Sequence, residues 1–205
     1  MEYRRLGNSG LRVSRIALGC MSFGDTSRGF SEWSLGDEDA EPFFQQAVEL
    51  GVTFWDTANV YGFGSSEEIP GRALKKYSRR EDIVLATKVH FKMHDGPGGS
   101  GLSREAIMEQ IDASLARLDT DYVDLYQIHR FDPKRRSRKP WRRSTTSLRP
   151  ARPATLAARR CGRGPFSKMQ YVADLHEWTR FVSMQDQYNL MQREEEREMF
   201  GLLAD

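Results

Sequence analysis

The sequence predicts an α/β protein with a parallel β-sheet, and two observations support this fold class. Between residues 1 and 129, short apolar and β-branched segments alternate with longer amphipathic segments, which is the pattern of repeated strand–helix units. The 205 residues, 39% of them hydrophobic, are enough to bury one sizeable core. We therefore expect one domain over residues 1–205, folded as a barrel or a doubly wound sheet.

The N-terminal segment predicts a β-hairpin followed by a buried strand. The sequences MEYRRL and LRVSRI flank GNSG, whose composition favours a tight turn. The next apolar run, IALG at 16–19, predicts the first buried strand of the sheet. The hairpin would then cover one end of a barrel.

Helices and strands alternate through the rest of the chain. Acidic residues open two amphipathic segments and Ser103 suits the N-cap of a third, so we expect helices at 37–50, 65–77 and 103–118. Apolar runs predict strands at 52–58, 83–89 and 122–129. Towards the C-terminus the same patterns predict a helix at 166–178, a strand at 180–188 and a helix at 193–205.

Composition argues against several classes of protein. The two cysteines, Cys20 and Cys161, lie outside any metal-ligand spacing, so we expect neither a disulfide framework nor a metal site. No apolar run approaches the roughly 20 residues that span a bilayer, and the N-terminus lacks the apolar segment of a signal peptide. We therefore expect a cytoplasmic protein with no membrane partner, whose oligomeric state the sequence leaves open.

Four polar side chains fall at or just beyond the carboxyl ends of predicted strands. Asp56 ends the second strand, Tyr61 follows five residues later, Lys88 ends the third strand and His129 ends the fourth. Active sites of parallel α/β folds assemble at this end of the sheet. We therefore expect the four to share a catalytic site, although each alone is also compatible with an ordinary polar residue at a strand end.

The chemistry of carbonyl reduction suits this set. Hydride transfer to a carbonyl leaves an alkoxide that must take a proton, and an isolated tyrosine is too weak an acid for this near neutral pH. The ammonium of Lys88 would stabilise the phenolate of Tyr61, and Asp56 would keep that ammonium charged and in place. His129 would direct the carbonyl oxygen towards Tyr61 or relay a proton.

Longer motifs resemble one known family. The segments LGCMSFG, FWDTANVYGFGSSEE with GRAL, LATKV and RLDTDYVDLYQIHRFD are similar to those of the aldo-keto reductases, and the resemblance covers residues 1–132 and 166–205. It is closest to the bacterial NADP-dependent branch of the family. It implies a (β/α)8 TIM barrel, a bound NADP(H) and a small aldehyde, ketone or sugar-derived carbonyl as substrate.

The resemblance also implies where the cofactor would bind. Cys20 and Met21 match the loop after the first strand, beside the nicotinamide ribose, and Asp56 also lies near that ribose. Gln185 matches the residue that binds the carboxamide, although taken alone it is also compatible with a polar residue of the barrel interior. No GxGxxG motif directly follows a predicted strand, and the glycines at 96–101 indicate a flexible loop, in keeping with a family that binds NADPH without a Rossmann fingerprint.

A basic segment at 134–165 departs from the family, because it holds twelve Lys or Arg residues and no acid. With one choice of codons, a one-base shift of the reading frame turns 134–147 into ETPIEETMEALHDV, 148–157 into VEAGKARYIG and 159–164 into SSMWAW. These sequences resemble the fourth helix and fifth strand of the family. We therefore hypothesise a compensated frameshift, entered near Lys134 and left near Pro165, either in the gene or in its sequencing. The segment as written would disrupt the fifth βα unit.

Two alternatives for the basic segment are a solvated linker and a nucleic-acid-binding insertion. Arginine runs can neutralise phosphates, but Trp141 is the one aromatic side chain of the segment that could stack on a base. We therefore expect no nucleic-acid partner.

The sequence ends where the family would continue to its seventh and eighth strands. We therefore expect an incomplete barrel of about six βα units, and weak or no turnover from this chain. Two alternatives to an active NADPH-dependent reductase stay open. One is a non-catalytic barrel that binds nucleotide and regulates a partner, and the other is a non-functional product of frameshift and truncation.

Overall fold

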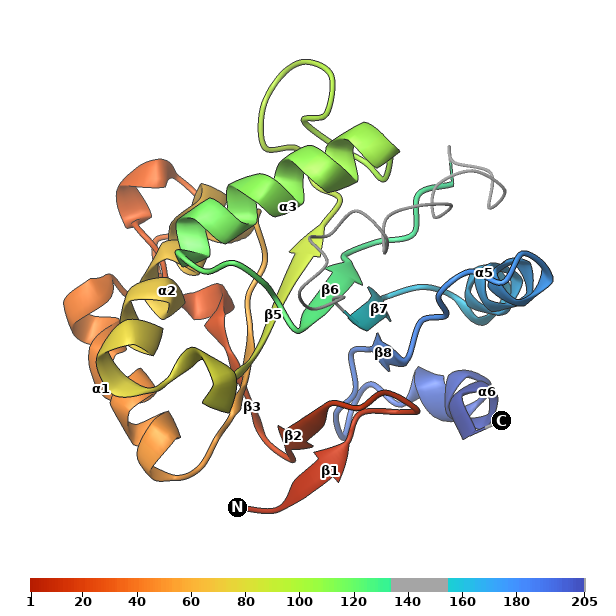
Figure 1. The fold of residues 1–205 in the computed structure, drawn as a ribbon, viewed down its shortest axis with the longest axis horizontal. Helices are drawn as coiled ribbons and strands as arrows, with labels where there is room; N and C mark the ends of the chain where they lie inside the picture. Colours follow the sequence, from red (N-terminus) through yellow and green to blue (C-terminus); the bar gives the residue numbers. More distant parts are fainter. Residues whose placement is uncertain (134–154, 205) are drawn as a thin grey trace.

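A computed structural model describes residues 1–133 and 155–204. Its main feature is a curled sheet of six parallel strands, each paired with the next one along the chain (Figure 1). The strands are β3 (Ala17–Gly19), β4 (Phe54–Asp56), β5 (Val84–Val89), β6 (Leu125–Ile128), β7 (Thr155–Arg159) and β8 (Ser183–Gln185). A doubly wound sheet would reverse its strand order, whereas sequential pairing is that of a (β/α)8 barrel. The predicted incomplete α/β barrel is confirmed.

Helices lie on the convex side of the sheet (Figure 1). They are α1 (Asp37–Glu49), α2 (Ser65–Tyr77), α3 (Arg104–Leu118), α5 (Arg163–Leu175) and α6 (Met199–Ala204). The predicted cap of α3 is confirmed, because the Ser103 hydroxyl oxygen accepts a hydrogen bond from the Ala106 N–H at 3.0 Å. In the part of the chain that the structure describes, no helix has the length and apolar character needed to cross a membrane.

Pro70 lies inside α2 and links this helix to the sheet. Proline has no N–H to donate to the carbonyl four residues earlier, which here belongs to Ser66. That carbonyl instead accepts a hydrogen bond from the Thr57 hydroxyl at 2.9 Å. Because Thr57 directly follows β4, the start of α2 is tied to the end of that strand.

The two faces of the sheet carry separate hydrophobic clusters. The larger lies between the sheet and the helices and includes Phe44, Trp55, Leu85 and Ile107, each at most 1% exposed. The smaller lies inside the curve and consists of buried side chains of three neighbouring strands, Ala86, Leu125 and Ala157.

The N-terminal hairpin covers the smaller cluster. Strands β1 (Tyr3–Arg5) and β2 (Arg12–Ser14) pair antiparallel, and Leu6 and Leu11 between them pack against the cluster together with Phe54. Since Phe54 is the first residue of β4, the hairpin lies at the amino ends of the strands. The predicted hairpin and its place at one end of the barrel are confirmed.

The fifth strand, which we expected to be lost, is present as β7. Leu156, Ala157 and Ala158 are buried there, and β7 pairs with β6 on one side and β8 on the other. A parallel ladder uses backbone groups, and small apolar side chains fit the core, so TLAAR forms a strand without the residues of the family. The hypothesised frameshift otherwise falls largely on residues 134–154, which lie outside the described residues.

Two further expectations are wrong in detail. The strand at 16–19 is not buried: Ala17 and Gly19 are exposed, and among the described strands β3 pairs with β4 alone. The helix expected at 193–205 is divided into η5 (Glu194–Glu196) and α6. The charged run that opens this segment offers no apolar stripe to pack against the core.

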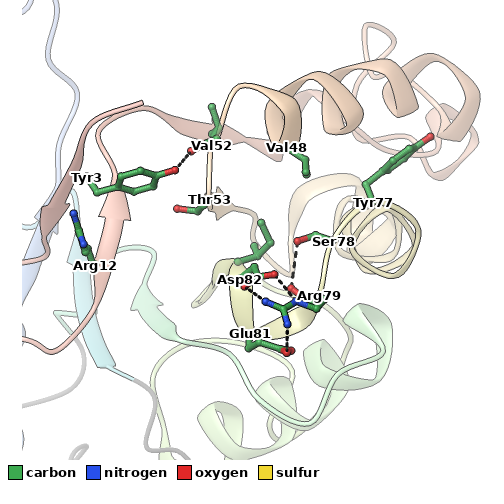
Figure 2. A pocket seen from close by; sticks show the side chains of 12 residues that line it. Tyr3, Arg12, Val48, Val52, Thr53, Tyr77, Ser78, Arg79, Glu81 and Asp82 are labelled. Carbon is green, nitrogen blue, oxygen red and sulfur yellow. Dashed lines mark hydrogen bonds and ion pairs between the residues drawn. The ribbon is translucent and has the colours of Figure 1, made fainter.

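An open cleft of about 950 Å³ lies at the amino ends of β4 and β5, beside the hairpin. Tyr3 and Arg12 of the hairpin form one wall, and the loop that leads into β5 forms another (Figure 2). The guanidinium of Arg79 is paired there with the carboxylates of Glu81 and Asp82. This cleft is at the end of the sheet opposite to the predicted catalytic residues.

Candidate active site

The curled sheet brings the four predicted catalytic residues together. Asp56 is the last residue of β4, Lys88 is next to last in β5, and His129 follows β6. Tyr61 begins η3 (Tyr61–Gly64), the short turn between β4 and α2. All four side chains are buried, with 7% or less of each residue exposed.

Lys88 is the centre of the site. Its Nζ donates to Asp56 Oδ2 at 2.6 Å, to the Thr57 carbonyl oxygen at 2.8 Å and to the Tyr61 hydroxyl at 3.4 Å. An ammonium has three donors, so these contacts satisfy all of them. Because Lys88 has no exposed surface, its charge depends on these partners rather than on water.

Two glutamines hold Asp56 in place. Gln127 Nε2 donates to Asp56 Oδ1 at 2.6 Å, and Gln185 Nε2 donates to Asp56 Oδ2 at 3.1 Å. The sequence analysis did not identify Gln127. Its signal was available, because it is a polar residue in an otherwise apolar strand, two positions before His129 and therefore on the same face.

His129 lies beside Tyr61 in a desolvated position. Its ring is perpendicular to the Tyr61 ring, with centroids 5.4 Å apart, and Phe91 covers it at 4.8 Å. Burial, helped by the positive charges of Lys88, Arg159 and Arg130, lowers the pKa of His129 to about 2. The imidazole is therefore neutral near pH 7, and within the described residues its Nδ1 has no hydrogen-bond partner.

The turn that carries Tyr61 requires glycine. Gly62 has φ 54° and Gly64 has φ 96°, the left-handed region that side chains disfavour. A Cβ on Gly62 would lie 2.2 Å from the Ser65 hydroxyl oxygen. That hydroxyl donates to the Gly62 carbonyl at 2.8 Å and accepts from the Asp25 N–H at 2.9 Å. This contact fixes the Tyr61 turn against the loop after β3.

A buried carboxylate anchors α2 behind the site. Glu67 has no exposed surface; its carboxylate is paired with Arg117 Nε at 2.6 Å and accepts a hydrogen bond from the Thr87 hydroxyl. Thr87 precedes Lys88 in β5, so Glu67 ties the helix after Tyr61 to the strand that carries Lys88. The sequence analysis treated Glu67 as an acid of the first helical turn and missed this role.

The predicted cofactor residues occupy different environments. Cys20 in η1 (Cys20–Ser22) is fully buried, and burial together with the nearby Asp56 carboxylate raises the pKa of its thiol. Met21 is 42% exposed. Gln185 lies in the site through its bond to Asp56, and its Oε1 is buried without a partner in the part described. Residues 1–133 and 155–204 contain no group of three His, Cys, Asp or Glu residues that could hold a metal ion.

Comparison with known proteins places this arrangement in a family. Residues 15–149 match the sequence profile described as the aldo/keto reductase family. The chain belongs to the aldo/keto reductase family. The resemblance inferred from the motifs is confirmed at the level of the family.

The matches to three relatives cover the full length of this aldo/keto reductase chain. Over all of the chain it is 38% identical to versiconal hemiacetal acetate reductase of Aspergillus parasiticus, and 39% identical to an aldo-keto reductase of Fusarium vanettenii. It is 33% identical to an uncharacterised oxidoreductase of Bacillus subtilis. The chain spans 64%, 61% and 63% of the lengths of these three proteins.

A solved structure agrees with the fold. A thermostable aldo-keto reductase, crystallised with the inhibitor epalrestat, superposes with a TM-score of 0.79 at 29% sequence identity. The alignment covers 97% of this chain and 66% of that protein. The aldo/keto reductase barrel is therefore present here as a curled sheet of six strands.

Proposed function

We propose that this protein reduces small aldehydes or ketones to alcohols with NADPH, using Tyr61 as the proton donor. The observation that carries the proposal is the buried ammonium of Lys88, which bonds Asp56 and Tyr61 at the same time. A lysine without exposed surface is costly to bury. The contact with a phenol that must release a proton is a chemical reason for burying this charge.

Each side chain has a distinct part in the reaction. Tyr61 donates its hydroxyl proton to the carbonyl oxygen as negative charge develops there. The ammonium of Lys88, 3.4 Å from the Tyr61 oxygen, stabilises the phenolate that remains. Asp56 keeps Lys88 charged and positioned, and Gln127 in turn keeps Asp56 positioned.

The neutral state of His129 favours one of its two candidate roles. With a pKa of about 2, the imidazole holds no extra proton to relay near pH 7. A neutral imidazole still donates one N–H. His129 therefore directs the carbonyl oxygen towards Tyr61 by a hydrogen bond, and its position edge-on to the Tyr61 ring suits that role.

A reduced nicotinamide dinucleotide supplies the hydride when it is bound. The residues at the carboxyl ends of the strands fit such a group, because the buried, unpartnered Oε1 of Gln185 offers an acceptor for the carboxamide N–H. Exposed Met21 would lie beside the ribose, and fully buried Cys20 would contribute its backbone only. The choice of NADPH over NADH rests on the family resemblance of the motifs.

Further parts of the proposal rest on the sequence alone. We propose that the protein belongs to the bacterial NADP-dependent branch, whereas the relatives described above are mostly fungal. We also propose a cytoplasmic location, and a small carbonyl compound rather than a nucleic acid as partner. The frameshift hypothesis for 134–165 also remains a proposal. Resequencing the gene tests the version in which the shift is a sequencing error, and a read that matches the present frame without a base offset would overturn that version.

The test is an assay of purified protein with NADPH and a panel of simple aldehydes, followed by cofactor absorbance and fluorescence. We expect slow turnover that Tyr61→Phe abolishes while cofactor binding persists. Cofactor binding without turnover would support a regulatory barrel instead. Neither binding nor turnover from a chain with a folded far-UV spectrum would overturn the proposal, and an unfolded spectrum would support a non-functional product.

A further inference from the structure

Three arginines gather at the carboxyl ends of β6 and β7, beside the candidate active site. Arg130 follows His129, Arg159 is the last residue of β7, and Arg160 comes directly after it. Burial, together with repulsion by Arg160 and Arg159, lowers the pKa of Arg130. Ile128 pairs with Ala158, so two residues further on Arg130 and Arg160 leave neighbouring strands side by side.

The backbone register turns Arg159 into the site. Arg159 is the partner of Gln185 in the β7–β8 ladder, and the Gln185 side chain reaches Asp56 inside the curve of the sheet. Paired residues of neighbouring strands project to the same face, so Arg159 also projects inward. Ile128 pairs with Ala158, which makes His129, the next residue, the neighbour of Arg159 on β6.

In the part of the chain that the structure describes, none of these three arginines forms an ion pair with a carboxylate. The Arg160 guanidinium donates to the neutral amide oxygen of Gln187 at 2.6 Å. Asp56 is already bonded to Lys88 and two glutamines. Residues 134–154 contain no Asp or Glu. Arginines that pair with no carboxylate, at the mouth of a site, attract anionic ligands.

We infer that Arg159 is a specificity-determining residue that binds a carboxylate of the substrate, so that the preferred substrates are carbonyl compounds carrying a carboxylate group. The planar guanidinium matches a carboxylate with two parallel hydrogen bonds. Its place next to His129 puts the carboxylate beside the carbonyl oxygen that His129 and Tyr61 bind. This inference rests on the proposed function of the same site.

Binding without turnover tests the anion site directly. Benzoate and benzamide have similar shapes and differ in charge, and each is titrated into the purified full chain with heat or NMR shifts as readout. We expect benzoate to bind about 10- to 100-fold more tightly, the range of a charge-assisted hydrogen bond. Arg159→Met should abolish the difference, Arg159→Lys should retain part of it, and the exposed control Arg180→Met should leave it unchanged.

Kinetics test the same residue during reduction. Catalytic efficiency towards the substrate 2-formylbenzoate, whose carboxylate is next to the aldehyde, is compared with catalytic efficiency towards its methyl ester. Arg159→Met should lower the efficiency with the carboxylate about 10- to 100-fold and leave that with the ester within about twofold. The double variant R159S/R160S introduces the two serines that the shifted reading frame would encode, and it should lose the carboxylate preference in the same way.

Several results would overturn the inference. The inference fails if the unmodified chain binds benzoate and benzamide with equal affinity. It also fails if Arg159→Met lowers the catalytic efficiency equally with the carboxylate and with the ester, since that indicates a structural role. If Arg159→Met weakens adenosine 2′,5′-bisphosphate but not benzoate, the anion belongs to the cofactor and the inference also fails. Arg159-dependent benzoate binding without turnover of any carbonyl would refute the proposed function alone.

Discussion

The buried ion pair of Lys88 and Asp56 should stabilise the fold far more than an exposed pair with similar geometry. Lys88→Met removes three hydrogen bonds from a site with no exposed surface, and it leaves the Asp56 carboxylate with only two amide donors. Breaking a buried ion pair costs about 3–5 kcal/mol. We therefore expect Lys88→Met to lower the free energy of unfolding by at least about 3 kcal/mol.

A double-mutant cycle separates the pair from its surroundings. Asp56→Asn should cost a similar amount, and the double variant should cost less than the sum, with a coupling of about 2 kcal/mol. The measurement is urea unfolding of the four proteins, followed by far-UV circular dichroism.

The exposed pair of Arg72 and Asp37 is the matched control. Their contacts of 2.7 and 2.8 Å are nearly as short as the 2.6 Å contact of the buried pair, but the side chains are 55% and 59% exposed. The coupling between Arg72→Met and Asp37→Asn should stay below about 1 kcal/mol. Equal couplings for the two pairs would refute the reasoning that burial sets the strength of the Lys88 contact.

Three further predictions concern single positions. The pKa of His129 falls to about 2 from an ordinary 6.5, because burial favours the neutral imidazole. The free energy of unfolding should therefore be highest above pH 6.5 and should fall by about 1.4 kcal/mol per pH unit below it. His129→Gln should flatten that part of a pH series of urea midpoints. Gly71→Ala places a Cβ 2.6 Å from the Leu118 carbonyl oxygen and should cost about 1–3 kcal/mol, whereas Gly164→Ala meets nothing within 4 Å and should not lower the thermal midpoint. Ser103→Ala should cost about 1 kcal/mol by urea unfolding, and Ser103→Asp should restore it.

The sequence predicted which four residues meet at the candidate active site, because their positions follow from the periodicity of the chain. Asp56, Lys88 and His129 each end an apolar run, and parallel strands bring such ends to one edge. The supporting residues depend on contacts between distant segments. Glu67 looked like an ordinary acid of a first helical turn, and only the packing of α2 on β5 and α3 shows that it is buried and paired.

The region around β7 shows where sequence patterns are weakest. The many arginines of 134–165 concealed a strand, because TLAAR is short and its pairing with β6 and β8 uses backbone groups that no side-chain pattern records. The inward direction of Arg159 follows from its pairing with Gln185 in the β7–β8 ladder. This pairing register cannot be deduced from the sequence. Residues 134–154 lie outside the described residues, so the helix expected there from the shifted frame stays a prediction.

Isotope transfer tests whether Tyr61, supported by Lys88, protonates a carbonyl as hydride arrives. NADPH deuterated at both C4 positions is incubated with 2-formylbenzoate, and the alcohol is analysed by mass spectrometry. The account predicts one deuterium at the carbinol carbon of the product, and no alcohol from Tyr61→Phe that retains the far-UV spectrum of the unmodified chain. Absence of labelled alcohol from the unmodified chain, or an undiminished yield from Tyr61→Phe, would contradict it.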